Sequence, residues 1–101
     1  MSTRAAPIKD PDATLDYTRS WSGWLQTGEE IVTSEWFVAG ADEVLEIGTD
    51  EYAPTSDATT ATVWLIGGTE GETYVVTNRI TTDNVPPRTD DRSFSVYIGQ
   101  R

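Results

Sequence analysis

Threonine recurs along the chain in short runs beside Val, Ile, Trp or Tyr, as at residues 59–62 and 81–82. Side chains of the β-branched and aromatic kinds fit the pleated surface of a sheet, and they lose rotamer freedom in a helix. No segment repeats apolar residues at helical spacing for three turns. The sequence therefore predicts an all-β fold.

Turn residues divide this pattern into six or seven short strands. The glycines at 67, 68 and 71 supply the positive φ that a hairpin needs, so residues 72–82 should pair back on residues 58–66. Strands about ten residues apart with such turns favour an antiparallel β-sandwich. We expect strands at residues 15–19, 30–38, 44–47, 58–66, 72–82 and 92–98, one helical or tight turn at 20–25, and loops at 52–57 and 83–91.

The length of 101 residues indicates one domain. The first twelve residues differ in composition from the rest. Residues 1–12 contain Pro7 and Pro11 and few apolar side chains. We therefore expect an extended N-terminal arm at residues 1–12 and a β-sandwich domain at residues 13–101. No apolar run is long enough for a signal peptide or a membrane span, the longest being residues 63–66.

Alternation along each strand predicts which side chains are buried, because successive residues point to opposite faces of a sheet. It leaves Trp64, Val75 and Tyr97 on the outer faces, which suggests contact with a partner; the alternative is that Trp64 lies in the core. Trp36 and one of Trp21 and Trp24 are expected in the core. The inward sets are Ala61, Val63 and Leu65; Tyr74, Val76 and Ile80; and Phe94, Val96 and Ile98.

Composition excludes most catalytic chemistry. The chain has no Cys and no His, so it has no disulfide, thiolate or imidazole to offer. Carboxylates are abundant, but pairs such as Asp90–Asp91 and Glu29–Glu30 lie in polar, turn-like segments. The acidic segments 10–12, 49–51 and 89–91 lack the spacing of a calcium loop. We expect no catalytic residue, no metal and no cofactor.

The net charge of −10 also restricts the partners. Nucleic acids and anionic membranes are recognised through Lys and Arg, of which the chain has 7 against 17 acidic residues. Neither is therefore an expected partner. A protein partner should present a relatively basic surface, and the association should slow as salt rises.

Two stretches resemble a family of small bacteriophage and prophage virion proteins, described as fibre–tail adaptors or minor structural proteins. Residues 8–17 (IKDPDATLDY) with residues 21–25 (WSGWL) resemble the opening of these proteins, and residues 67–82 and 88–94 are similar to a later part. The resemblance extends over residues 8–98. It implies an immunoglobulin-like sandwich that is part of a phage particle and carries no catalytic residue, although the Cys–Trp–Cys pattern of antibody domains is absent.

These expectations together describe a non-enzymatic virion protein, made in the host cytoplasm. It would be a multicopy adaptor at the head–tail connector, the tail or the fibre attachment point, and would bind other virion proteins. A capsid decoration protein and a carbohydrate-binding module that uses the Trp and Tyr side chains are the alternatives. The candidate partner-binding residues are Ile8, Trp64, Val75, Tyr97, Pro86, Pro87 and Arg88.

Overall fold

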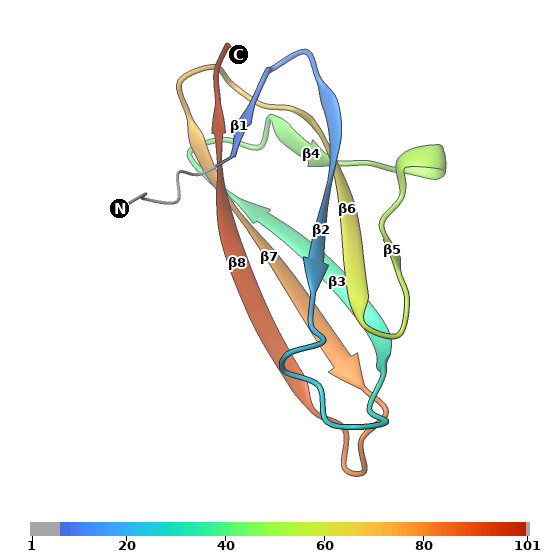
Figure 1. The fold of residues 1–101 in the computed structure, drawn as a ribbon. Coiled ribbons are helices and arrows are strands. Elements are labelled where there is room, and N and C mark those ends of the chain that lie inside the picture. The colour runs from blue at the N-terminus through green and yellow to red at the C-terminus, as the bar shows by residue number, and fades with distance from the viewer. Residues whose placement is uncertain (1–6, 101) are drawn as a thin grey trace.

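A computed structural model, which describes residues 7–100, folds into two packed β-sheets, as the all-β prediction required (Figure 1). We call the first the long sheet. Its strand order is β1–β8–β7–β3, with β1 at Ile8–Lys9, β8 at Thr89–Ile98, β7 at Thr73–Thr82 and β3 at Ile31–Ala39.

The second layer, which we call the short sheet, has β6 at its centre. One edge of β6 pairs with β2, and the other edge pairs with both β4 and β5. A single turn of 3₁₀ helix, Asp50–Tyr52, joins β4 to β5. The strands are β2 at Thr14–Ser20, β4 at Leu45–Ile47, β5 at Thr55–Ser56 and β6 at Thr60–Gly67.

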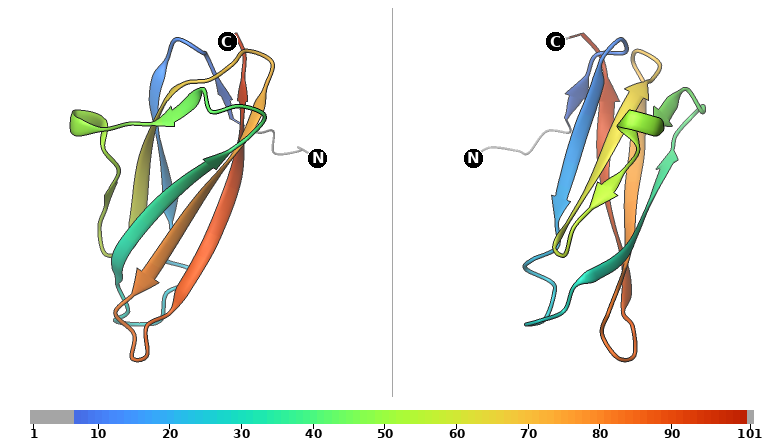
Figure 2. Two further views of the ribbon diagram at one scale, coloured as in Figure 1. Left: turned by 180° about the vertical axis from the view of Figure 1, so that it is seen from behind. Right: turned by 90° about the vertical axis from the view of Figure 1, so that its right-hand side faces the viewer.

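The hairpin predicted around the glycines is wrong. β6 belongs to the short sheet and β7 to the long one, so residues 67–72 carry the chain from one layer to the other (Figure 2). Gly67, Gly68 and Gly71 do adopt positive φ. At Gly68 a Cβ would come within 2.6 Å of the side chain of Ile98, so the crossover also needs a residue without a side chain. The hairpin of this region is instead β7–β8.

Two residues of the segment expected as an extended arm form a strand, β1. Ile8 pairs with Tyr97 and Lys9 with Ile98 in a parallel ladder, the exception in an otherwise antiparallel sandwich. Lys9 is buried, and its Nζ donates hydrogen bonds to the carbonyls of Gly67 (2.7 Å) and Asp10 (3.0 Å). Residues 1–6 of the expected arm lie outside the described residues, and the domain boundary at residue 12 stays a prediction.

The core consists of two hydrophobic clusters, and the inward sets predicted from alternation are confirmed. The larger cluster contains Trp36 and lies between the sheets, with Phe94 partly buried against it. The smaller cluster contains Trp21, which is fully buried. Trp24 is only partly buried against this cluster, so Trp21 is the core residue of the two. The larger comprises Trp36, Leu45, Ala61, Val63, Leu65, Tyr74, Val76, Val96 and Ile98; the smaller comprises Trp21, Ile31 and Ile80.

The two ends of the sandwich are formed by different segments of the chain (Figure 1). The terminal end contains β1 and the last residues of β8. The loop end contains residues 21–30 and residues 83–88. At the loop end the amides of Trp24 and Leu25 donate to the carbonyl of Trp21, at 2.9 and 3.0 Å, so the single turn predicted at residues 20–25 is confirmed.

Candidate functional site

Four exposed apolar side chains form a diagonal stripe across the outer face of the long sheet. They are Ile8 on β1, Tyr97 on β8, Val75 on β7 and Phe37 on β3, with 45, 40, 42 and 44% of their surface exposed. Each strand of the sheet contributes one. Exposed apolar side chains gathered on one face of a soluble protein indicate an interaction surface.

Strand register places these four side chains next to one another. Ile8 lies directly opposite Tyr97. Tyr97 lies opposite Thr73, so Val75 is its diagonal neighbour, and Val75 lies opposite Ala39, so Phe37 is the next diagonal neighbour. Diagonal pairs on one face of a sheet lie within reach of aromatic and long side chains. The diagonal stripe is therefore continuous.

The rest of this outer face is mostly hydroxylic. Thr77 and Ser93 share a hydrogen bond of 2.7 Å between their side chains, and Thr81 and Thr89 share one of 3.1 Å. Such side chains present a flat polar surface that needs no counter-ion in an interface.

Charge on this face is confined to the part nearer the loop end. The guanidinium of Arg79 donates to both carboxylate oxygens of Asp91, at 2.8 and 3.0 Å, and lies 5.1 Å from the ring centre of Phe37. This ion pair raises the pKa of Arg79 and lowers the pKa of Asp91. Glu35 lies opposite Arg79 on β3. The carboxylate of Asp91 is therefore paired, and that of Glu35 lies on the edge strand towards the loop end, so a partner can cover the diagonal stripe and leave Glu35 at the rim, where its charge opposes binding least.

The structure brings together three of the seven predicted partner residues: Ile8, Val75 and Tyr97. Phe37 is not among the candidate residues predicted from the sequence. Strand alternation does point to it, because Trp36 is expected in the core and the next residue along the strand must then face outward.

Trp64 lies on the outer face of the other sheet. Buried and partly buried residues alternate along β6, and Trp64 falls in the partly buried, outward set, as predicted. The ring of Tyr52 partly covers it in an edge-to-face contact, with the two ring centres 5.2 Å apart. Trp64 is therefore separated from the diagonal stripe by the whole thickness of the sandwich, and the two cannot form one continuous surface.

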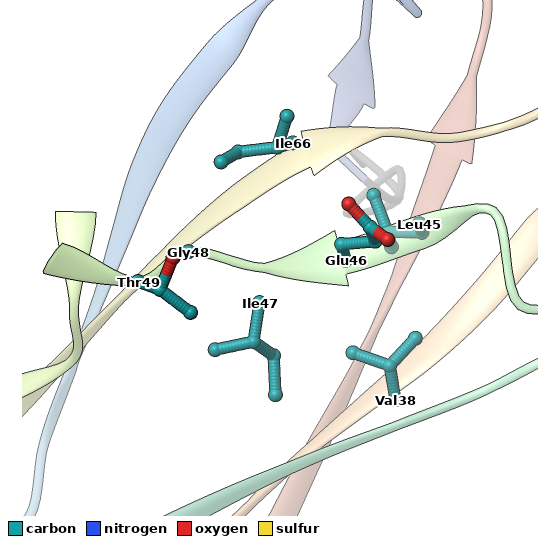
Figure 3. Close-up of a pocket in the computed structure, with 7 residues that line it drawn as sticks. All are labelled: Val38, Leu45, Glu46, Ile47, Gly48, Thr49 and Ile66. Atoms are coloured by element: carbon teal, nitrogen blue, oxygen red, sulfur yellow. The ribbon is translucent and has the colours of Figure 1, made fainter.

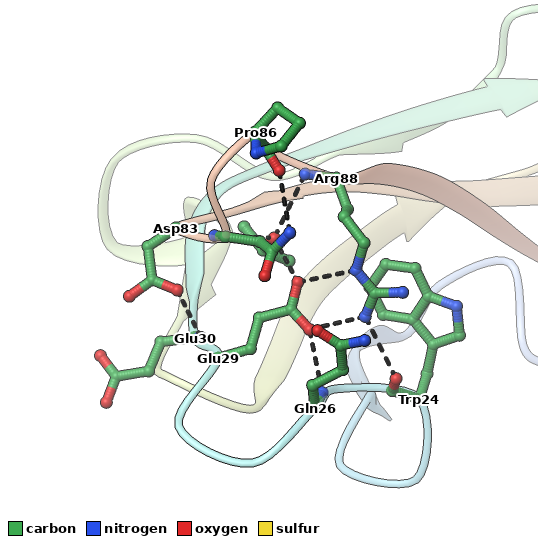
Figure 4. A network of polar contacts seen from close by, with 9 residues as sticks. Trp24, Gln26, Glu29, Glu30, Asp83, Pro86 and Arg88 are labelled. Carbon is green, nitrogen blue, oxygen red and sulfur yellow. Dashed lines mark hydrogen bonds and ion pairs between the residues drawn. The ribbon is translucent and has the colours of Figure 1, made fainter.

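The remaining predicted residues lie at the loop end. Pro86 and Pro87 are exposed. The guanidinium of Arg88 points inward instead, and it donates two hydrogen bonds to the carboxylate of Glu29, Nη2 to Oε1 at 2.6 Å and Nε to Oε2 at 2.9 Å (Figure 4). It also lies 4.0 Å from the ring centre of Trp24. Arg88 is therefore engaged within the chain.

Glu29 is the residue at this end that sequence reasoning missed. It is buried, and besides Arg88 it accepts hydrogen bonds from the hydroxyl of Thr82 (2.6 Å) and the amide of Gln26 (2.9 Å). The hydrogen bond from Arg88 is the main cause that lowers the pKa of Glu29 to about 2. No local pattern distinguishes Glu29 from Glu30, because its partner lies 59 residues away.

An open groove of about 550 Å³ separates β3 from β4 (Figure 3). Val38 and Ile47 line it from the two sheets, and Glu46 is its charged residue. Aromatic side chains, on which sugar rings would stack, are absent from its lining, which is Val38, Leu45, Glu46, Ile47, Gly48, Thr49 and Ile66. The groove therefore gives the carbohydrate-binding alternative no platform.

The described cations are engaged within the chain. Lys9 is buried, Arg79 and Arg88 are in ion pairs, and Arg19 and Arg92 lie over aromatic rings, 3.9 Å from the centre of Phe94 and 4.4 Å from the centre of Trp21. Among residues 7–100, two carboxylates are in ion pairs. The outer surface is therefore strongly acidic.

Among residues 7–100, no group of three or more acidic residues is placed to hold a metal ion. Within the same residues, no helix has the length and hydropathy of a membrane span.

Comparison with known proteins identifies the family. No curated protein matches the chain. Residues 9–97 match a family described as the podophage GP4 fiber-tail adaptor protein gp77, which agrees with the resemblance found in the sequence. The match extends over most of the chain and includes every strand from β2 to β7 and nearly all of β8. The chain therefore belongs to the podophage GP4 fiber-tail adaptor gp77 family and is a phage structural protein.

Proposed function

We propose that this chain is a non-enzymatic adaptor of the virion that binds another virion protein through the diagonal stripe. The observation that carries the proposal is the continuity of Ile8, Tyr97, Val75 and Phe37 across all four strands of the long sheet, on a face with little unpaired charge. Protein interfaces favour this composition, with aromatic anchors at the centre and charge at the rim.

The surrounding charge supports a partner with a basic rim. The described cations are engaged within the chain, whereas only two of the carboxylates in residues 7–100 form ion pairs with the cations of that same range. Opposite charge on a partner would speed encounter and orient it, while the apolar stripe supplies the buried contact. We place the adaptor in several symmetric copies at the tail or its connector, because a small domain that docks through a defined face suits a ring of equivalent sites.

A single substitution at the centre of the diagonal stripe tests the proposal. Val75→Asp places a carboxylate where the partner would bury it, and it should weaken binding by at least about tenfold, as loss of a central anchor commonly does. The readout is binding of the purified chain to particles assembled without it. Thr33→Asp is the matched control, because Thr33 is exposed on the same strand as Phe37 and four residues from it.

The outcomes of this test are decisive. Loss of binding by Val75→Asp with retention by Thr33→Asp, both variants unfolding at the wild-type temperature, supports the proposal. Normal occupancy of Val75→Asp particles would overturn it. Counting copies on each particle tests the station: a small ring number supports the tail or connector, whereas hundreds of copies would instead indicate decoration of the capsid.

A further inference from the structure

The loop between β7 and β8 ends in an apolar apex that projects at the loop end (Figure 1). Val85 has 93% of its surface exposed, and Pro86 and Pro87 beside it are exposed as well. An isolated aliphatic side chain this exposed makes no contribution to the core. We call residues 83–88 the prong.

The base of the prong is fixed by the buried carboxylate of Glu29. Arg88, at the end of the prong, donates two hydrogen bonds to it, and Thr82, just before the prong, donates a third (Figure 4). Replacing a buried ion pair by apolar side chains is often neutral for stability, so such a pair is weak evidence of a stabilising role. The pair of Glu29 and Arg88 does fix the geometry of this end, because it holds residues 24–29 against residues 82–88.

Further contacts hold the prong itself. The amide of Glu30 donates to the carboxylate of Asp83 (2.9 Å), and the amide of Asp83 donates to the carbonyl of Glu30 (3.0 Å). Within the prong, the side-chain amide of Asn84 donates to the carbonyl of Pro86 (2.9 Å). Pro86 and Pro87 each have a restricted φ. A loop ordered in this way loses little conformational entropy when it binds.

The position of the prong separates it from the diagonal stripe. Val75 and Thr82 are seven residues apart on β7, which separates them by about 23 Å along an extended strand. The prong begins beyond Thr82. Two partners could therefore occupy the stripe and the prong at the same time.

We infer that the prong inserts its apex, Val85 to Pro87, into an apolar pocket with a basic rim on a second virion protein, distinct from the one that covers the diagonal stripe. The inference rests on the proposed function, since it gives an adaptor its second contact. Charge complementarity specifies the rim: Asp83 and Glu30 are exposed at the base of the prong, whereas the charge of Arg88 is neutralised by Glu29. The clamp formed by Glu29 and Arg88 positions the apex.

The test uses the full chain and two probes: particles that lack both this chain and the fibres, and purified fibre protein. Val85→Asp should weaken binding to one probe by at least about tenfold and leave the other unchanged. Val75→Asp should show the opposite pattern. Thr27→Asp, which adds the same charge at an exposed position of the loop end, is the matched control and should bind both probes normally.

Each outcome separates the two ideas. If Val85→Asp binds both probes as the wild type does, the inference that the prong binds a partner is wrong. Loss of the same probe by Val85→Asp and Val75→Asp would overturn the two-partner arrangement. Wild-type binding of Val75→Asp, with loss of one probe by Val85→Asp, would leave the prong standing while the proposed function of the stripe fails.

The clamp has its own test. Glu29→Gln and Arg88→Lys should weaken binding to the prong's probe while binding to the stripe's probe stays unchanged, and amide hydrogen exchange in residues 83–88 should accelerate. Unchanged binding to the prong's probe in both variants would remove the positioning role.

Discussion

The terminal end and the loop end of this sandwich are held by different kinds of contact. Beneath the diagonal stripe lies the larger cluster, made almost entirely of aliphatic and aromatic side chains. At the loop end the smaller cluster shares its space with buried polar side chains, Glu29, Asn78 and Thr82. Strand alternation suffices to orient the stripe, whereas directional hydrogen bonds are needed to orient a loop.

Two buried tryptophans show the difference. Trp21, at the loop end, donates from Nε1 to the side-chain oxygen Oδ1 of Asn78 at 2.9 Å. The side-chain nitrogen Nδ2 of Asn78 in turn donates to the hydroxyl of Ser34 (2.9 Å) and to the backbone carbonyl of Glu35 (3.0 Å). Trp36, in the larger cluster, is buried with no partner for its Nε1 among the described residues. One indole is part of a polar network, and the other acts only by packing.

The largest expected effect comes from replacing each tryptophan by Phe. Trp21→Phe should lower the free energy of unfolding by about 3 kcal/mol, because it removes buried volume and leaves the side-chain oxygen Oδ1 of Asn78 without its donor. Trp36→Phe removes similar volume but breaks no hydrogen bond, so about 1 kcal/mol is expected. Urea unfolding of both variants measures the difference, and equal losses would contradict a polar network at the loop end.

A smaller effect is expected from the ion pair that holds the prong. Arg88→Met leaves the carboxylate of Glu29 buried without its counter-ion and should destabilise the chain. The double variant Glu29→Gln, Arg88→Met removes the stranded charge and should be more stable than Arg88→Met alone. Thermal unfolding of the single and double variants tests this. A double variant less stable than the single one would mean that the pair itself stabilises the fold.

The pH dependence of stability isolates the same carboxylate. The pKa of Glu29 is lowered from 4.5 to about 2, so its ionised form stabilises the folded chain. This contribution is complete above the unfolded value of 4.5 and is lost as the pH falls towards 2. Unfolding in urea between pH 5 and pH 2 should show a steeper loss for the wild type than for Glu29→Gln. Parallel curves would contradict the role of Glu29, since the other carboxylates with lowered pKa are common to both proteins.

The features that could be predicted from the sequence lie mainly in the strands and the diagonal stripe, and those that could not lie mainly in the connections and at the loop end. Alternation has a period of two, so the inward sets and the outward positions of Val75 and Tyr97 were correct. The pairing of strands was not predictable in the same way: the glycines at 67–71 suit a hairpin and a crossover equally, and the chain uses them for the crossover. The place of Ile8 beside Tyr97 depends on a pairing between segments from opposite ends of the chain.

The clamp formed by Glu29 and Arg88 could not be predicted from the sequence. Glu29 and Arg88 come from two polar loops 59 residues apart, and Glu29 is followed by a second glutamate, so nothing beside either residue in the sequence indicates the pair. Arg88 was therefore interpreted as a partner-binding side chain, and Glu29 as a solvated charge in a turn. Contacts of this kind depend on which loops meet at one end of the sandwich, and that is decided by the sheet topology.

The smallest expected effect sharpens the boundary of the diagonal stripe. Thr77 lies directly opposite Phe37 and two residues from Val75 on the same face of β7, and its hydroxyl bonds only to that of Ser93 among the contacts described. Thr77→Val keeps the β-branched shape and replaces the hydroxyl by a methyl group, so the free energy of unfolding should change by about 0.5 kcal/mol or less. Because the methyl group joins Val75 to Phe37, binding to the stripe's partner should be as tight as in the wild type or tighter, whereas binding through the prong should not change. Weaker binding to the stripe's partner, measured by titration against the particles, would show that the hydroxyl pair rather than the apolar stripe is what that partner recognises.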